Sequence, residues 1–150
     1  MESLKRVLGF GMVLGMVFGA GAGYGAGSVT VYNAGGSFNC ATDTIQLGVN
    51  ACPVGGTVSV SAGTYTEAVY INEGIALIGS GTPVIDPSVA GSGVTFDGNG
   101  ADNAIISGFK ITGATDGIDC INGADPRLAN NLISGNSSHG IYCNSSSPSI

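Results

Sequence analysis

The sequence predicts an all-β fold: a right-handed parallel β-helix solenoid with three short strands in each coil and a repeat period of 22–24. Three observations predict it. The chain has 27 glycines scattered among β-branched residues, it is 43% hydrophobic but only 9% charged, and one short segment recurs at nearly constant spacing. High hydrophobicity with little charge excludes a disordered chain. Glycines between short apolar clusters indicate short strands joined by tight turns.

The recurring segment gives the length of the coil. Gly-Ile-Asp-Cys at 117–120 returns as Gly-Ile-Tyr-Cys at 140–143, an offset of 23. Gly-Val-Thr-Phe at 93–96 precedes the first of these segments by an offset of 24. Ser-Pro-Ser-Ile at 147–150 repeats the pattern of 125–128 at an offset of 22. A near-constant period with single-position slips in the turns is typical of a solenoid.

The type of solenoid follows from the apolar clusters. Leucine-rich repeats have similar length, but their Leu-x-x-Leu-x-Leu frame is absent. Each period instead holds about three short apolar clusters, such as those at 105–106, 109–111 and 118–120. Three strands per coil, stacked about 4.8 Å apart, would place like residues on like residues. We therefore expect aliphatic ladders inside and polar ladders at the turns, one of them formed by Asn130 and Asn131.

Residues 42–52 predict a short capping α-helix of about three turns, estimated from the helical repeat. Ile45 and Val49 occupy positions i and i+4 behind a Thr/Asp start, and Pro53 with the following glycines ends the segment. Because the first coil of a solenoid exposes unpaired backbone and apolar side chains, a cap is expected there. Before it, residues 28–32 alternate and predict a first strand.

The N-terminus predicts a signal peptide over residues 1–22, because Lys5 and Arg6 precede an apolar stretch that ends in small residues. The alternative is an uncleaved membrane anchor. No second such stretch follows, so we expect no stable membrane span in the mature chain and a secreted, periplasmic or cell-surface location. Residues 28–150 would form the cap and first coils. Since the sequence stops inside a repeat, we expect an N-terminal fragment truncated at its C-terminus.

Charge excludes one class of partner. Without Glu2, Lys5 and Arg6, nine acidic residues remain against Lys110 and Arg127, so the net charge is 2 − 9 = −7. Two cations cannot form the basic patch that nucleic-acid binding requires. Binding of an acidic polysaccharide is disfavoured for the same reason, unless a divalent cation bridges the two.

Four segments resemble a known family: Asp-Thr-Ile-Gln at 43–46, Gly-Thr-Val-Ser-Val at 56–60, Ala-Gly-Thr-Tyr-Thr-Glu at 62–67 and Gly-Ile-Ala-Leu-Ile-Gly at 74–79. They resemble the N-terminal region of the pectin lyase-like, right-handed β-helix superfamily. The resemblance implies the fold. It does not select a function, because this superfamily includes polysaccharide lyases, esterases, glycosidases, epimerases, adhesins and structural coils.

The basic and histidine residues do not predict a catalytic site. Lyases of this superfamily combine calcium-binding carboxylates with an Arg or Lys base. Lys110 and Arg127 are separated by less than one repeat period, so we expect them on different sides as surface charges. His139 is the only histidine and cannot form a zinc or copper site alone, so we expect a solvated turn residue.

The aspartates could form an acidic face such as the hydrolases of this fold use. They are Asp97, Asp102, Asp116, Asp119 and Asp125. Asp119 alternates with apolar neighbours and should point outward, and we interpret the others as turn residues. The stretch 97–102 is similar to an oxygen-rich calcium loop, although it lacks the glutamate of an EF-hand. We therefore expect no cofactor, with calcium as the alternative.

Four cysteines allow three disulfide connectivities. Cys40 and Cys52 bracket the predicted cap, and we expect a disulfide between them. Cys120 and Cys143 occupy the same repeat position and should stack in one interior ladder. There we expect them to pack as small hydrophobic side chains, with a cross-coil bridge as the alternative.

No residue of this chain is assigned a catalytic or metal-binding role. We expect a secreted or cell-envelope scaffold that is structural or binds a ligand, with an extracellular polysaccharide as the candidate partner. The alternative is the N-terminal part of a polysaccharide-active lyase, esterase or glycosidase whose catalytic coils lie beyond residue 150.

Overall fold

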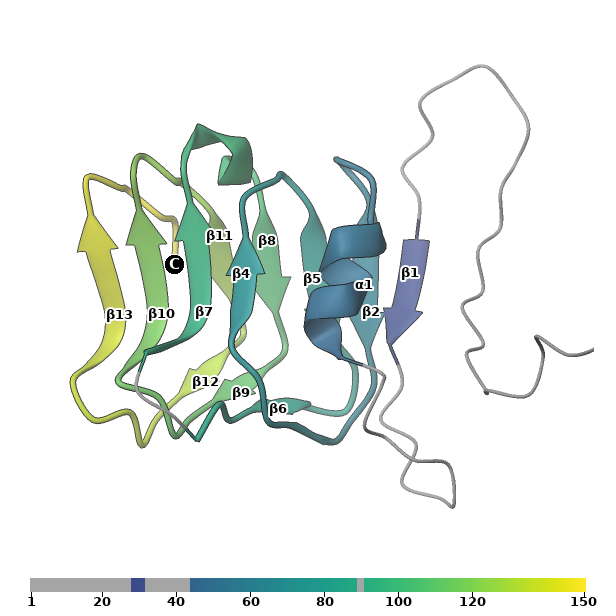
Figure 1. Cartoon of the computed structure of the whole chain (residues 1–150), viewed down its shortest axis with the longest axis horizontal. Coiled ribbons are helices and arrows are strands. Elements are labelled where there is room, and N and C mark those ends of the chain that lie inside the picture. Colours follow the sequence, from purple (N-terminus) through teal and green to yellow (C-terminus); the bar gives the residue numbers. More distant parts are fainter. Residues whose placement is uncertain (1–27, 32–43, 89–90) are drawn as a thin grey trace, which may run out of the picture.

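The computed structural model describes residues 28–31, 44–88 and 91–150. They form a β-solenoid of about four turns built from three parallel sheets, with one short α-helix before its coils (Figure 1). This architecture confirms the predicted all-β solenoid. The predicted signal peptide at 1–22 and the predicted disulfide partner Cys40 lie outside the described residues, so both stay predictions.

Each coil contributes one strand to each sheet, and every strand pair is parallel. We name the sheets A, B and C. Sheet A contains β1 (Ser28–Val31), β2 (Thr57–Val60), β5 (Ala76–Gly79), β8 (Ile105–Ser107) and β11 (Arg127–Ala129). Sheet B contains β3 (Thr64–Tyr65), β6 (Val84–Ile85), β9 (Lys110–Ile111) and β12 (Leu132–Ile133). Sheet C contains β4 (Val69–Ile71), β7 (Ser92–Asp97), β10 (Asp116–Ile121) and β13 (His139–Asn144).

The strand register confirms the repeat found in the sequence. Cys120 on β10 lies opposite Cys143 on β13 and opposite Phe96 on β7, which reproduces the predicted offsets of 23 and 24. An isolated parallel bridge between Arg127 and Ser149 confirms the last repeat and its offset of 22. Each slip in spacing is absorbed in a turn, because a slip inside a strand would reverse which side chains face the core.

The core consists of the inward-facing residues of the three sheets. In β7 and β10 the buried positions are the third and fifth of each strand, together with the glycine before them. Val94 stacks on Ile118, and Phe96 on Cys120, so the predicted apolar ladders are present. Phe109 fills the corner between β8 and β9 and is fully buried. Among the described residues, no polar or charged side chain belongs to the buried class.

The predicted ladder seeded by Asn130 and Asn131 is not formed; instead, Asn131 and Asn136, both in the last coil, bond backbone groups of the preceding coil. Asn131 Oδ1 accepts a hydrogen bond from the backbone N–H of Phe109 at 3.1 Å, and its Nδ2 donates to the carbonyl of Ile106 at 2.9 Å. Asn136 makes an equivalent pair of hydrogen bonds at the next turn. Its Oδ1 accepts from the backbone N–H of Ala114 at 3.1 Å, and its Nδ2 donates to the carbonyl of Ile111 at 3.3 Å. Asn130 adopts a positive φ of 54° in the turn.

The predicted capping helix is present as α1 (Ile45–Ala51), but it has seven residues, about two turns by the helical repeat, instead of the predicted three. Thr44 has extended backbone angles, and its side chain accepts a hydrogen bond from the N–H of Leu47 at 3.1 Å. The helix therefore begins after Thr44, which acts as its N-cap.

The helix takes the place of a preceding strand beside β4 (Figure 1). The Gln46 side chain accepts from the backbone N–H of Tyr70 at 2.6 Å and donates to its carbonyl at 3.1 Å, so it pairs with the edge of β4 as a strand would. Glu67 accepts hydrogen bonds from the N–H groups of Ile45 and Gln46 at 2.7 and 3.0 Å. Burial raises the pKa of Glu67, although these two bonds oppose the change. The cap is thus held by side chains of the first coil.

One strand lies where the sequence pattern indicates only a turn. Residues 61–64 are typical of a turn, yet Thr64 pairs with Val84 in β3. Tyr65 in this strand is buried against the core at 4% exposure, and its hydroxyl donates to the carbonyl of Ser61 at 3.0 Å. Strands of two residues carry too little alternation to be recognised from sequence.

Candidate functional site

The outer face of sheet C carries polar and aromatic side chains on all four strands. One row of residues in register runs across its four strands: Tyr70, Thr95, Asp119 and Tyr142. The two tyrosines end this row and are 44% and 40% exposed. With neighbouring strands about 4.8 Å apart, three such steps separate their backbones by about 14 Å. We call this face the tyrosine face.

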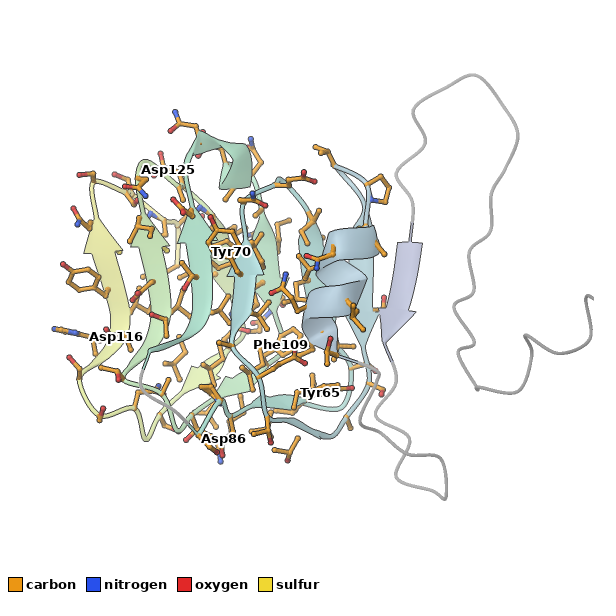
Figure 2. The ribbon with its side chains drawn as sticks, in the orientation of Figure 1. Tyr65, Tyr70, Asp86, Phe109, Asp116 and Asp125 are labelled. Carbon is orange, nitrogen blue, oxygen red and sulfur yellow. The ribbon has the colours of Figure 1, made fainter. Side chains whose placement is uncertain are left out.

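Tyr70 belongs to a hydrogen-bonded cluster that joins three coils. Its hydroxyl donates to Asp97 Oδ2 at 2.6 Å, and Asn122 Nδ2 donates to Asp97 Oδ1 at 2.7 Å. These two bonds hold the pKa of Asp97 below its ordinary value, while the bond to Asp97 raises the pKa of Tyr70. Asp97 is therefore ionised at neutral pH and fixes the orientation of the Tyr70 ring. Figure 2 labels Tyr70 on this face.

Tyr142 is supported by a second cluster at the other end of the row. His139 lies against Tyr142 with ring centroids 5.4 Å apart, and its Nδ1 is 2.7 Å from Asp116 Oδ1. The predicted solvated turn residue is thus the exposed first residue of β13 and has a defined partner. The hydrogen bond from His139 lowers the pKa of Asp116.

The Ser138, His139 and Asp116 side chains do not form a catalytic triad. Ser138 Oγ is 2.8 Å from His139 Nδ1, the same nitrogen that contacts Asp116. In a triad the carboxylate and the nucleophile bind opposite nitrogens of the ring, so that the imidazole transfers a proton between them. Here one nitrogen serves both contacts, and the arrangement is structural.

Asp119 points outward, as its alternation predicts, and lies in the middle of the row. Ser92 Oγ donates a short hydrogen bond to Asp119 Oδ2. Asp119 Oδ1 is shielded from solvent and has no hydrogen-bond partner in the structure. Because solvent does not reach this oxygen, a ligand on the outer face does not reach it either.

Asp102 and Asp125 act at the turns, as predicted, whereas the prediction is wrong for Asp97, which ends β7, and for Asp116, which begins β10. Asp102 Oδ1 accepts from the backbone N–H of Asp125 at 3.0 Å, and Asp125 Oδ1 accepts from the N–H of Ser147 one coil later. Asp97 and Asp102, which begin and end the stretch similar to a calcium loop, therefore bond to different groups. Within the described ranges no three His, Cys, Asp or Glu side chains lie close enough to hold a metal ion.

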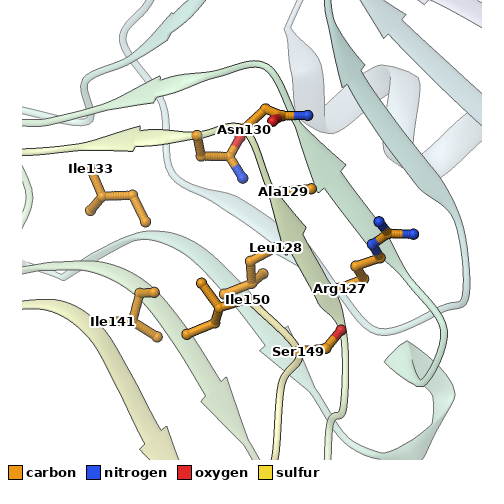
Figure 3. A pocket seen from close by; sticks show the side chains of 9 residues that line it. Arg127, Leu128, Ala129, Asn130, Ile133, Ile141, Ser149 and Ile150 are labelled. Carbon is orange, nitrogen blue, oxygen red and sulfur yellow. The ribbon is translucent and has the colours of Figure 1, made fainter.

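The two basic residues lie on different sheets, as their spacing predicts. Lys110 is on β9 of sheet B and Arg127 on β11 of sheet A, so neither lies on the tyrosine face. A separate cavity of about 350 Å³ lies beside the last coil, and Arg127 is part of its rim (Figure 3). Apolar and polar side chains share its lining: Leu128, Ile133, Ile141 and Ile150 on one hand, and Arg127, Asn130, Asn131 and Ser149 on the other.

The cysteines are placed as the repeat predicts. Cys120 is fully buried and Cys143 is exposed, although the two occupy equivalent positions. The difference arises because β7 and β13 cover β10 on both sides, whereas β13 is the outermost strand of sheet C. The expectation that Cys143 packs inside a covered ladder is thus wrong for this coil. Cys52 is buried next to the cap.

Sequence reasoning missed both tyrosines, Asn122 and the contacts of the cap. The signal for Tyr142 was available, because it occupies the repeat position of Asp119, which was predicted to point outward. Tyr70 could have been placed in the same row by extending the repeat one coil back. Asn122 gave no such signal, because its contact with Asp97 joins a turn to a strand end.

No helix among the described residues is long and apolar enough to cross a membrane. Comparison of the chain with models of protein families, with curated proteins and with solved structures finds no match. The resemblance to the pectin lyase-like superfamily therefore stays a prediction, and what is established is a parallel β-solenoid scaffold with a polar, aromatic outer face.

Proposed function

We propose that this protein is a non-catalytic scaffold that binds a linear, neutral polysaccharide along its tyrosine face. The observation that carries the proposal is the row in register from Tyr70 to Tyr142, with Thr95 and Asp119 between the rings. The row runs along the axis of the solenoid, so an extended chain of sugars can lie across all four strands.

The chemistry of the row suits sugars. A pyranose ring has an apolar face that packs on an aromatic ring, and hydroxyl groups that need hydrogen-bond partners at its edge. The exposed tyrosine rings offer the apolar contact, and Asp97 and Thr95, which lie on or beside the row, offer the hydrogen-bond partners. The Asp97 and Asp116 contacts hold Tyr70 and Tyr142 in place before a ligand arrives, which lowers the entropic cost of binding.

Charge favours a neutral ligand. The net charge of the chain is −6, and the carboxylates Asp97, Asp116 and Asp119 are on or beside the row. A polyanion such as polygalacturonate would be repelled. Because Asp97 and Asp116 have lowered pKa values, they are ionised at neutral pH and cannot serve as the proton donor that a glycosidase requires. This favours binding over hydrolysis at this face.

Binding can be tested by affinity electrophoresis of the protein in gels containing neutral glucan, mannan or xylan, with polygalacturonate as the charged comparison. We expect retardation by at least one neutral polysaccharide and none by polygalacturonate. Replacing one ring, as in Tyr142→Ala, should weaken binding about tenfold, as the loss of one aromatic contact predicts. Tyr142→Phe should retain most of it, because the ring remains.

The matched control is Leu132→Ala, which removes a side chain that is 57% exposed on sheet B. It should bind like the wild type. Absence of retardation by every neutral polysaccharide, or equal binding by Tyr142→Ala and the wild type, would contradict the proposal.

A further inference from the structure

Two cysteine thiols meet between the last two strands of sheet C. Cys120 and Cys143 are paired in register on β10 and β13, so their side chains lie on the same, inner side of sheet C. Residues paired in this way have backbones about 4.8 Å apart. That separation lies within the range of about 4.4–6.8 Å between Cα atoms that a disulfide spans.

The two thiols differ in their access to solvent. Cys143 is exposed, whereas Cys120 is fully buried between β7 and β13. An exogenous disulfide can therefore reach Cys143, and only a thiol of the same molecule can reach Cys120. An accessible thiol in contact with a buried one is the arrangement in which a mixed disulfide is resolved internally.

We propose that Cys120 and Cys143 are a redox-active pair that closes to a cross-coil disulfide by exchange with a small-molecule disulfide, and so fastens β13 to β10. The proposal does not depend on polysaccharide binding. It concerns the inner side of sheet C, whereas the tyrosine face is the outer side.

The exchange balances with oxidised glutathione as the oxidant. The thiolate of Cys143 attacks one glutathione sulfur, a mixed disulfide forms, and one glutathione thiolate leaves. The thiolate of Cys120 then attacks the Cys143 sulfur, the protein disulfide forms, and the second glutathione leaves. The two cysteines lose two electrons and two protons in total, and one glutathione disulfide is reduced to two thiols.

The second step should be the slower one. Burial, together with the neighbouring Cys143 and the carboxylates of Asp119 and Asp125, raises the pKa of Cys120 to about 12. Since the thiolate is the attacking species, little of it is present at neutral pH. The mixed disulfide on Cys143 should therefore accumulate before the ring closes.

Closure should stabilise the last coil. The bond would close a loop about one coil long, and loop-closure entropy predicts that the unfolding equilibrium constant falls by roughly a hundredfold. The part of the fold that this bond would stabilise includes β13, which has one neighbour, β10, among the described strands of sheet C.

The pair can be tested on the full chain without a variant. The protein is incubated with oxidised glutathione, free thiols are alkylated, and the chain is digested with trypsin under non-reducing conditions. Cleavage after Lys110 and Arg127 places Cys120 in peptide 111–127 and Cys143 in peptide 128–150, while Cys40 and Cys52 stay upstream of residue 111. A peptide pair linking 111–127 to 128–150 in monomeric protein is the expected result.

A second measurement compares urea unfolding of oxidised and reduced protein. We expect a higher midpoint for the oxidised wild type, and we expect Cys143→Ser to lose this increment while keeping any effect of Cys40 and Cys52. Recovery of Cys120 and Cys143 as separate alkylated peptides would overturn the proposal. A bond between the Cys143 residues of two copies, seen as a reducible dimer, would overturn it as well.

Discussion

Asn131, which joins two coils, tests how much one side chain that bonds the neighbouring coil contributes to the stability of the solenoid. Asn131 bonds the N–H of Phe109 and the carbonyl of Ile106, both in the preceding coil. Asn131→Ala removes both bonds and leaves two backbone groups of that coil without their partner. A lost hydrogen bond costs about 1 kcal/mol and an unsatisfied buried group about 1–3 kcal/mol, so we expect a loss of about 3 kcal/mol.

The assay is urea unfolding followed by circular dichroism. With an m-value of about 2 kcal/mol per M, a loss of about 3 kcal/mol lowers the midpoint by about 1.5 M. Asn131→Asp should recover little, because its second carboxylate oxygen would face the Ile106 carbonyl. Asn144→Ala is the matched control, since Asn144 is exposed and its side chain accepts a hydrogen bond only from Ser145 Oγ, at 3.3 Å, among the described residues. Equal midpoints for Asn131→Ala and Asn144→Ala would refute the reasoning.

The remaining predictions concern titration, close packing and the cap. Because the pKa of Glu67 is raised, its contribution to stability is lost as pH rises above the ordinary value of 4.5, so the advantage of the wild type over Glu67→Gln should shrink there in urea titrations. Asp97 has a lowered pKa, so the advantage of the wild type over Asp97→Asn should instead disappear as pH falls below 3.8, and an advantage that grows as pH falls would contradict the assignment of Asp97. In Gly100→Ala the new Cβ would overlap a backbone oxygen of the preceding coil, which should cost roughly 1–3 kcal/mol in thermal unfolding, whereas Gly140→Ala meets only ordinary contacts and serves as its control. Gln46→Ala should leave the edge of β4 unpaired and increase aggregation measured by light scattering, and an unchanged rate would show that the edge is protected by other means.

Much of the fold could be predicted because a solenoid repeats one local pattern. The offset of 23 between the two Gly-Ile-x-Cys segments places Cys120 on Cys143, and the alternation within each segment places Asp119 outside and Cys120 inside. In a parallel stack, the spacing along the sequence is also the register in space. The apolar ladders follow from that offset, and the three sheets follow from the three apolar clusters in each period.

The helix and the short strands were predicted less well, for a physical reason. A helix boundary depends on one residue's backbone, and here Thr44 adopts the extended N-cap conformation, so the helix is shorter than its apolar spacing indicates. Tyr65 is buried in a strand of two residues, which gives no alternation to detect.

The sequence by itself determined the period, the inward and outward positions, and the acidic character of the chain. Tertiary structure decided what no spacing encodes: that Gln46 completes the edge of β4, that Glu67 binds the start of α1, and that Asp97 holds the Tyr70 ring. It also decided that Cys143 is exposed while its equivalent Cys120 is buried. A repeat fixes which residues are equivalent, but the environment of each depends on the neighbouring coils, and those differ at the two ends of the stack.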